Sequence, residues 1–325
     1  PFLQRSIHLA PAHPTAQFNL AVAYLLAGNY ARGWPQYESR WNYEHLAGQL
    51  PKHTQPRWTG QDLKDKTILV EGEQGHGDNI QFVRFLWNLH VAGAKIKLKV
   101  TDGLIPLLSN SPIIEKVSSY LDDVGEFDYW TPIMSIPGIL GVTLENLPKP
   151  VNYLNVDQGR QQEWLQILGP KTRMRVGFCW SGRRDSWLNQ HKSVPFIVIL
   201  DMIKSNPRYE WVNLQVDADA EEEAALLEAG VQTYPGSVKS FVDTAALIMA
   251  MDVVIGVDTA VSHLSGALGR PTWIMLQKFS TDWRWLLNQD SSPWYSTARL
   301  FRQENFDDWA SVTKKVSQYL GWMTV

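Results

Sequence analysis

Hydrophobic positions along this chain follow two successive series, in each of which short apolar runs alternate with stretches that have apolar residues three or four apart. A short apolar run predicts a buried strand, and the wider spacing predicts a helix. The first series predicts strands at 67–70, 96–100, near 117, near 129 and at 153–156, with helices at 78–92, 103–109, 136–141 and 159–168.

The second series begins after Gly169-Pro170 and alternates in the same way. It predicts strands at 175–180, 211–214, 231–234, 253–257 and 272–276, helices at 194–205, 219–229, 240–250 and 260–268, and a last helix at 307–320. Two such series predict an α/β protein with two Rossmann-like, doubly wound domains, at 51–168 and 169–325. Ligands bind beyond the carboxyl ends of such strands, so two facing sheets would enclose a cleft.

Residues 1–50 are predicted to be a short all-α segment that leads into a linker. The pattern Asn19-Leu20-Ala21-x-Ala23-Tyr24, which follows a run ending at Pro11 and precedes Gly28-Asn29-Tyr30, resembles the tetratricopeptide repeat. One repeat and the end of another are visible, and a lone repeat cannot bury its apolar face. We therefore expect either further repeats before Pro1 or packing of this helix pair on the next domain.

Composition narrows the class of protein. The 325 residues are 44% hydrophobic and 19% charged, with a net charge of −3, which is typical of a soluble globular protein. No basic run exceeds Arg183-Arg184, which argues against a nucleic-acid partner, and no apolar run is long enough to span a membrane. With no signal-peptide pattern, we expect a cytoplasmic location. The single cysteine, Cys179, lies in an apolar strand and is expected to be inert core.

The stretch Asp258-Thr259-Ala260 ends the apolar run 253–257 and opens a helix. Free backbone N–H groups and a hydroxyl at such a position can hold an anion, although an ordinary helix cap is the equal alternative. An Asp carboxylate would repel a phosphate, so Asp258 is expected to cap N–H groups or to orient Thr259 and His263. His263 follows one turn later, either as a ligand to phosphate or ribose or as a buried structural histidine.

A second polar stretch, Gly75-His76-Gly77-Asp78, follows the strand predicted at 67–70. The glycines allow a tight turn and a close approach of the backbone to a ligand. Asp78 is a helix N-cap, a carboxylate displayed beyond the strand, or both. Arg84 and Glu73 lie near enough in sequence to influence Asp78 or to meet a ligand.

The order of three motifs resembles a GT-B glycosyltransferase of the heptosyltransferase-like family across about residues 67–320. The motifs are Gly75-His76-Gly77-Asp78, the run Val176-Gly-Phe-Cys-Trp180-Ser181-Gly182, and Gly256-Val-Asp258-Thr259-Ala260-x-x-His263-Leu. The resemblance implies that Asp78 is the general base and that Asp258, Thr259 and Ala260 hold the donor's diphosphate. It also implies a basic residue at the diphosphate, for which Lys192 is the nearest match and Arg183 the reserve. His76 departs from the family pattern, and no basic cluster marks a lipopolysaccharide acceptor, so heptose as the sugar is in doubt.

Further side chains are candidates for the cleft. Ser181 and Gly182 can contribute to the diphosphate site. Gln215, at a predicted strand end, either contacts a base or ribose or is a solvated polar residue of a loop. Trp283 and Arg284 flank the nucleotide or the cleft mouth, or pack in the core. Asp217-x-Asp219 resembles a metal-binding pair, but the acidic run that follows favours a helix start. We predict no required metal and no cofactor beyond the donor substrate.

The leading hypothesis is an inverting, metal-independent glycosyltransferase that moves a sugar from a nucleotide-sugar donor to an acceptor hydroxyl. The repeat resemblance suggests an acceptor on a protein, with a glycan as the other possibility. The first alternative is a non-catalytic repeat scaffold whose transferase-like domain binds nucleotide sugar without turnover. The second is an epimerase-like enzyme, for which His76, Glu73 and His263 are the available additional acid–base groups.

Overall fold

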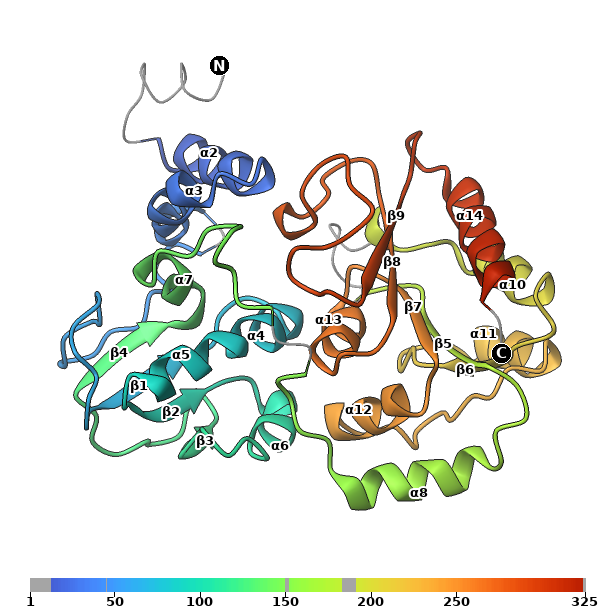
Figure 1. The fold of residues 1–325 in the computed structure, drawn as a ribbon, viewed down its shortest axis with the longest axis horizontal. Coiled ribbons are helices and arrows are strands. Elements are labelled where there is room, and N and C mark those ends of the chain that lie inside the picture. Colours follow the sequence, from blue (N-terminus) through green and yellow to red (C-terminus); the bar gives the residue numbers. More distant parts are fainter. Residues whose placement is uncertain (1–12, 45, 150–151, 183–190, 324–325) are drawn as a thin grey trace.

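Two parallel β-sheets stand side by side in the computed structural model, which describes residues 13–44, 46–149, 152–182 and 191–323 (Figure 1). The first sheet has the strand order β3-β2-β1-β4. Its strands are β1 (Thr67–Glu71), β2 (Lys95–Lys99), β3 (Lys116–Ser118) and β4 (Tyr129–Pro132). The second sheet has the order β6-β5-β7-β8-β9. Its strands are β5 (Arg175–Cys179), β6 (Glu210–Asn213), β7 (Val253–Val257), β8 (Thr272–Leu276) and β9 (Ala298–Arg302).

The strand order reverses beside the first strand of each sheet. β1 lies between β2 and β4, and β5 lies between β6 and β7, with all neighbours parallel. In a doubly wound sheet, ligands bind outside the carboxyl ends of the strands at this reversal. The segments after β1, β5 and β7 are therefore the positions where a ligand site is expected, and they carry the three motifs.

Two predicted strands are not formed. The strand at 231–234 is reduced to one bridge between Val212 and Gln232. The segment 153–156 is not a strand. Tyr153 instead donates its backbone N–H to the carbonyl of Ala267 (3.1 Å), at the end of a helix in the second half. β9 was not predicted.

Most of the helices predicted from the sequence are formed. Around the first sheet they are α4 (His76–Phe82), η2 (Val83–Phe85), α5 (Leu86–Val91), η3 (Asp102–Leu104), α6 (Ile105–Leu108), η4 (Ile133–Ser135) and α7 (Ile136–Ile139). Around the second they are α10 (Phe196–Lys204), α11 (Ala220–Glu228), α12 (Phe241–Met249), α13 (Ala260–Ala267), η5 (Trp283–Trp285) and α14 (Trp309–Trp322). The region 78–92 is broken into three short helices where the side chain of Arg84 donates to the carbonyl of Gln81 (2.8 Å).

Helix α8 (Gln158–Leu168) follows the first series in sequence but lies along α12 of the second half (Figure 1). Trp164 Nε1 donates to Asp243 Oδ1 at 3.2 Å, and Arg160 pairs with the same carboxylate. The sequence boundary drawn at 168 thus places in the first domain a helix that packs on the second.

The N-terminal helices α2 (Pro14–Leu26) and α3 (Tyr30–Tyr37), followed by η1 (Glu38–Asn42), sit against the first sheet's α7 and against η5. Trp34 of α3 meets Trp283 edge to face at 5.4 Å, and Trp294 Nε1 donates to the hydroxyl of Tyr30 (3.0 Å). Of the two expectations for this segment, packing on the next domain holds. The repeat resemblance stays a prediction, and the run before Pro11 lies outside the described residues.

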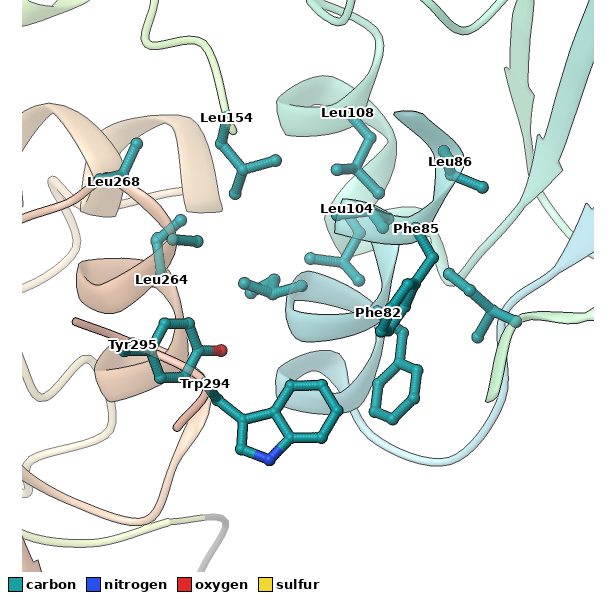
Figure 2. Close-up of a cluster of buried hydrophobic side chains, with 14 of the residues drawn as sticks. Phe82, Phe85, Leu86, Leu104, Leu108, Leu154, Leu264, Leu268, Trp294 and Tyr295 are labelled. Carbon is teal, nitrogen blue, oxygen red and sulfur yellow. The ribbon is translucent and has the colours of Figure 1, made fainter. Parts of the chain in front are cut away.

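One apolar core joins the two halves. Leu264 of α13 and Leu268, its C-cap, face Leu104 and Leu108 of the first half, and Trp294 lies beside Phe82 and Phe85 (Figure 2). The described residues include no helix with the length and apolar character that crossing a membrane requires. The short helices α4 and α13 pack directly on each other, which brings the motifs at their N-termini together.

Candidate active site between the two sheets

Asp78 lies at the first turn of α4, just beyond β1. Its Oδ2 accepts the backbone N–H of Gly75, the N-cap residue, at 2.9 Å. Its Oδ1 pairs with Arg284 from η5 of the second half. The Asp78 side chain is 21% exposed and its carboxylate is therefore reachable. The displayed carboxylate is therefore confirmed, whereas the N-cap interpretation is wrong, because Gly75 is the N-cap and Asp78 bonds back to it from the third helical position.

Arg284 brings this carboxylate into contact with the second half. Its Nη1 donates to both carboxylate oxygens of Asp282 (2.9 and 3.0 Å), and its Nε donates to Gln81. The side chain is only 4% exposed. Burial alone would lower the pKa of Arg284, but Asp282 and Asp78 outweigh it and hold the pKa above its usual value. The guanidinium is therefore a fixed cation between the two sheets.

The N-terminus of α13 is open in the way that an anion site requires. Thr259 is its N-cap, and no side-chain cap bond is made there. Of the two expected roles of Asp258, capping these N–H groups is not observed, and the contact with His263 is, because its carboxylate lies between Lys192 and His263. Ser181, which follows β5, is 6% exposed, and its Oγ has no hydrogen-bond partner among the described residues. Uncapped N–H groups and an unpartnered hydroxyl at adjacent strand ends are suited to phosphate oxygens.

Lys192, Asp258 and His263 form a polar row beside β7. Lys192 Nζ lies 3.0 Å from Asp258 Oδ2, and His263 Nε2 lies 3.4 Å from Oδ1. Burial would raise the pKa of Asp258, but Lys192 and His263 hold it well below its usual range. Asp258 in turn raises the pKa of Lys192, so this lysine is cationic at neutral pH. The Nδ1 of His263 lies 2.9 Å from the hydroxyl of Tyr295. The ring therefore has a partner at each nitrogen, and Asp258 is the one that helps to orient it from Nε2.

A small pocket, partly open to solvent, lies in the second half beside Lys192 and Asp258. Its lining residues are Lys192, Asp258, Met275, Leu276, Gln277, Thr281 and Asp282. Lys192 and Asp258 belong to the polar row, and Asp282 binds Arg284, which pairs with Asp78. Every residue that lines the pocket comes from the second half, and Asp78 of the first half lies near enough to help Asp258 and Asp282 raise the pKa of Lys192.

Gln215 has its amide oxygen occupied. Its Oε1 accepts the backbone N–H groups of Trp180 (3.2 Å) and Ser181 (3.0 Å) and the thiol of Cys179 (3.1 Å). This arrangement orients the segment after β5 that includes Gly182. Gln215 also borders a second hollow of about 280 Å³, together with Asn213, Glu223 and Tyr234. Arg183, the reserve for Lys192, lies outside the described residues.

The other predicted cleft residues divide between the interface and the core. His76 is exposed, and its ring meets Phe241 of α12 at 5.1 Å. Gly77 lies against His263 and Ala260. Arg84 is 2% exposed and donates to the carbonyl of Trp294 (2.6 Å) and the hydroxyl of Tyr153 (3.0 Å), so it ties the halves together.

Trp283 and several polar residues have structural partners. Trp283 is 3% exposed within the aromatic cluster of α3, so it packs in the core instead of lining the pocket. Glu73 is bound at both oxygens by Arg40, at 2.8 and 2.9 Å. Burial raises the pKa of Cys179 to about 12, which agrees with an inert core thiol.

Asp219 caps α11 by accepting the N–H groups of Glu221 (3.0 Å) and Glu222 (2.9 Å), which confirms the helix-start interpretation. Within the described ranges no group of three or more His, Cys, Asp or Glu side chains has a metal-binding arrangement.

Sequence reasoning missed Asp282, Gln277 and Thr281 as pocket residues. All three lie in the loop after β8, the position at which a parallel strand points toward a ligand. The available signal was the polar segment between the apolar run 272–276 and Trp283. The residues that follow this segment are among the sequence candidates, and the segment itself is not.

Residues 212–276 match the profile of Glycosyltransferase family 9 (heptosyltransferase). This region runs from the end of β6 through β7 and α13 to the end of β8, and therefore includes the Asp258–His263 turn. Protein FlbA of Caulobacter vibrioides is 30% identical over 333 residues, covering 94% of this chain and 54% of that protein. The chain thus spans about half the length of the curated relative it matches.

Solved structures share the fold. The E. coli ADP-heptose lipopolysaccharide heptosyltransferase II is 17% identical with a TM-score of 0.59, over 78% of this chain and 97% of that chain. The E. coli heptosyltransferase WaaC with ADP-2-deoxy-2-fluoro heptose is 14% identical with a TM-score of 0.54, over 78% and 99%. The architecture is therefore GT-B-like, and the family match supports a glycosyltransferase.

Proposed function

We propose that this protein is an inverting, metal-independent glycosyltransferase that uses a nucleoside-diphosphate sugar. The observation that carries the proposal is that Lys192 and Asp258 share one pocket with Asp282, which holds Arg284, and that Arg284 in turn pairs with Asp78 of the first half. A cationic, N–H-rich end and a carboxylate end, one from each half, are the two parts that sugar transfer needs. The family match over the Asp258–His263 turn points to the same chemistry.

In the proposed reaction, an acceptor hydroxyl attacks the anomeric carbon of the donor sugar and its proton passes to Asp78. A carboxylate within hydrogen-bond reach of the hydroxyl is suited to this general-base role. The bond between the anomeric carbon and the diphosphate oxygen breaks as the new glycosidic bond forms. A single displacement of this kind inverts the configuration at the anomeric carbon.

The leaving diphosphate takes the bonding electron pair, and its charge must be stabilised. The uncapped N-terminus of α13, the hydroxyl of Ser181 and the ammonium of Lys192 are the groups that we assign to this task. Because these groups are cationic or hydrogen-bond donors, the proposal needs no metal ion. Closure of the halves after the donor enters would exclude water.

The sugar and the acceptor are proposed only by class. WaaC is described with an ADP-heptose analogue, which makes ADP sugars the first donors to try, beside UDP, GDP, CMP and dTDP sugars. The helix pair α2 and α3 beside the first sheet favours an acceptor hydroxyl on a protein over one on a free glycan. A bound donor stabilises the folded state by mass action, so a thermal-shift screen identifies the nucleotide.

The test is transfer from the donor that this screen selects, with EDTA present and the anomeric configuration of the product determined by NMR. We expect EDTA-resistant release of nucleoside diphosphate and an inverted product. A retained configuration would overturn the single displacement, and loss of activity that added metal restores would overturn metal independence. Donor binding without transfer or hydrolysis would instead favour the non-catalytic scaffold.

A further inference from the structure

Arg284 is held from both halves of the molecule. From the second half, Asp282 accepts two hydrogen bonds from Nη1, at 2.9 and 3.0 Å. From the first half, Gln81 accepts from Nε and Asp78 accepts from Nη2. The guanidinium carbon also lies 4.4 Å from the ring centre of Trp283 and 5.5 Å from that of Phe82. Every guanidinium nitrogen therefore has a partner, and two rings fix its plane.

Asp78 depends on this arginine for its orientation. From its own half the carboxylate receives one backbone N–H, that of Gly75, at Oδ2. Within the described parts of the chain, Oδ1 has a single hydrogen-bond donor, and that donor is Arg284. Asp78 and Arg284 belong to different sheets, so this bond exists only while the halves are together.

Arg284 is in turn tied to the donor pocket. Asp282 lines that pocket, binds Nη1 and accepts the backbone N–H of Arg284 at 3.0 Å. A donor beside Asp282 and the carboxylate of Asp78 are thus joined through one buried side chain. The planar fork of arginine can bond two carboxylates at fixed angles, which a lysine cannot do.

Building on the proposed function, we infer that Arg284 is a positioning residue that aims Asp78 at the acceptor hydroxyl only when the two halves are closed. Asp78 is then an oriented base in the closed state and an unoriented one in the open state. This coupling would suppress attack by water on the donor before the halves close. Arg284 itself transfers no proton in this scheme.

The test compares Arg284→Gln and Arg284→Lys in the wild-type and Asp78→Asn backgrounds, with kcat, donor KM and nucleoside-diphosphate Kd measured for each protein. Misplacement of a reacting group by about 1 Å can cost roughly 100-fold in rate. We therefore expect R284Q to lower kcat by about that factor while Kd stays within about threefold of the wild-type value. The kcat of R284K should lie between those of R284Q and the wild type. In the Asp78→Asn background R284Q should cost little more, because the group that it positions is gone.

Arg175→Gln is the matched control. Arg175 is also buried and paired, with Glu210 at 2.9 Å, but it lies wholly within the second half at the opposite end of β5. The Arg175→Gln substitution should lower thermal stability and leave the kcat of the folded protein unchanged. An unchanged kcat in R284Q, or equal losses in both backgrounds, would overturn the inference.

Hydrogen exchange separates this inference from the proposed function. In R284Q the amides of 75–82 should exchange faster and should lose any protection that a bound nucleoside diphosphate gives to the wild type. Unchanged exchange there overturns the coupling, whether or not transfer is detected. Absence of transfer by the wild type with every donor, together with faster exchange in R284Q, would overturn the proposed function and leave the coupling of the halves standing.

Discussion

A Cβ atom on Gly77 would lie 2.7 Å from Cδ2 of His263 and 3.5 Å from the Cα of Ala260. The N-termini of α4 and α13 therefore approach each other at a distance that only glycine permits. The His263 ring cannot easily turn away, because its Nδ1 is bonded to the hydroxyl of Tyr295 and its face stacks on Trp285 at 5.4 Å. The close approach brings the two halves of the site together.

Gly77→Ala should weaken this contact. Overpacking of a well-packed interface costs about 1–3 kcal/mol, and we expect a loss of that size in the free energy of unfolding, measured with urea. Gly321→Ala in α14 is the control, because the nearest atom to its new Cβ is 3.9 Å away. A G77A protein within about 0.5 kcal/mol of the wild type would show that the contact is looser than described.

Lys192→Gln should reduce donor affinity. The change removes the cation beside the proposed diphosphate site and leaves Asp258 without its ammonium partner. Hydrogen bonds to charged groups contribute about 1.5–3 kcal/mol, so the Kd for a nucleoside diphosphate should rise by roughly 10- to 100-fold. Lys171→Gln is the matched control, since Lys171 pairs with Asp252 at the amino-terminal end of the same sheet. Equal effects of the two substitutions on Kd would argue against a phosphate at Lys192.

Arg84→Lys should destabilise the protein through the contact between the halves. Lysine cannot reproduce the two hydrogen bonds to Trp294 and Tyr153, nor the stacking on Tyr295, whose ring centre is 4.8 Å away. We expect a loss of about 2–4 kcal/mol in the free energy of unfolding. A loss below about 1 kcal/mol in urea titrations would mean that the halves are held mainly by the apolar core.

Glu38 should make the protein acid-sensitive. Burial would raise its pKa, but Arg40, with Ser135 and Arg57, lowers the pKa from 4.5 to about 2. A carboxylate with a depressed pKa in the folded state stabilises the protein above its unfolded pKa and loses this effect as protons bind. The difference in unfolding free energy between the wild type and Glu38→Gln should therefore shrink as the pH falls from 4.5 to 2. A difference that stays constant over this range would contradict the assignment.

The sequence predicted the elements whose residues are buried on every side. β5, β7 and β8 each contain an apolar run of at least four residues, and every residue of each strand is buried. β9 was missed because Arg299 and Arg302 leave only Leu300-Phe301 as an uninterrupted apolar run. Arg299 is accommodated by stacking on Tyr319 of α14 and by a hydrogen bond to its hydroxyl, which no local pattern reveals. The false strand at 153–156 fails because its backbone bonds to α13.

Site residues could be predicted from the sequence only where a single short segment determines their position. The Asp258–His263 turn and Asp78 each stand at the end of an apolar strand, so their place at a carboxyl edge follows from local pattern. The pairing of Asp78 with Arg284 joins residues 206 positions apart and depends on how the halves dock. The contact of Asp258 with His263 was among those expected from the local pattern, whereas its contact with Lys192, 66 positions away, depends on the fold.

The central claim is that Asp78 and the Asp258–His263 turn act on one bound donor. Its most direct measurement is the turnover and the donor Kd of Asp78→Asn beside the wild type. Removal of a general base typically costs about 100- to 10,000-fold in rate, and we predict a kcat loss in that range with donor Kd within about threefold. An Asp78→Asn protein that transfers sugar at the wild-type rate would contradict the account.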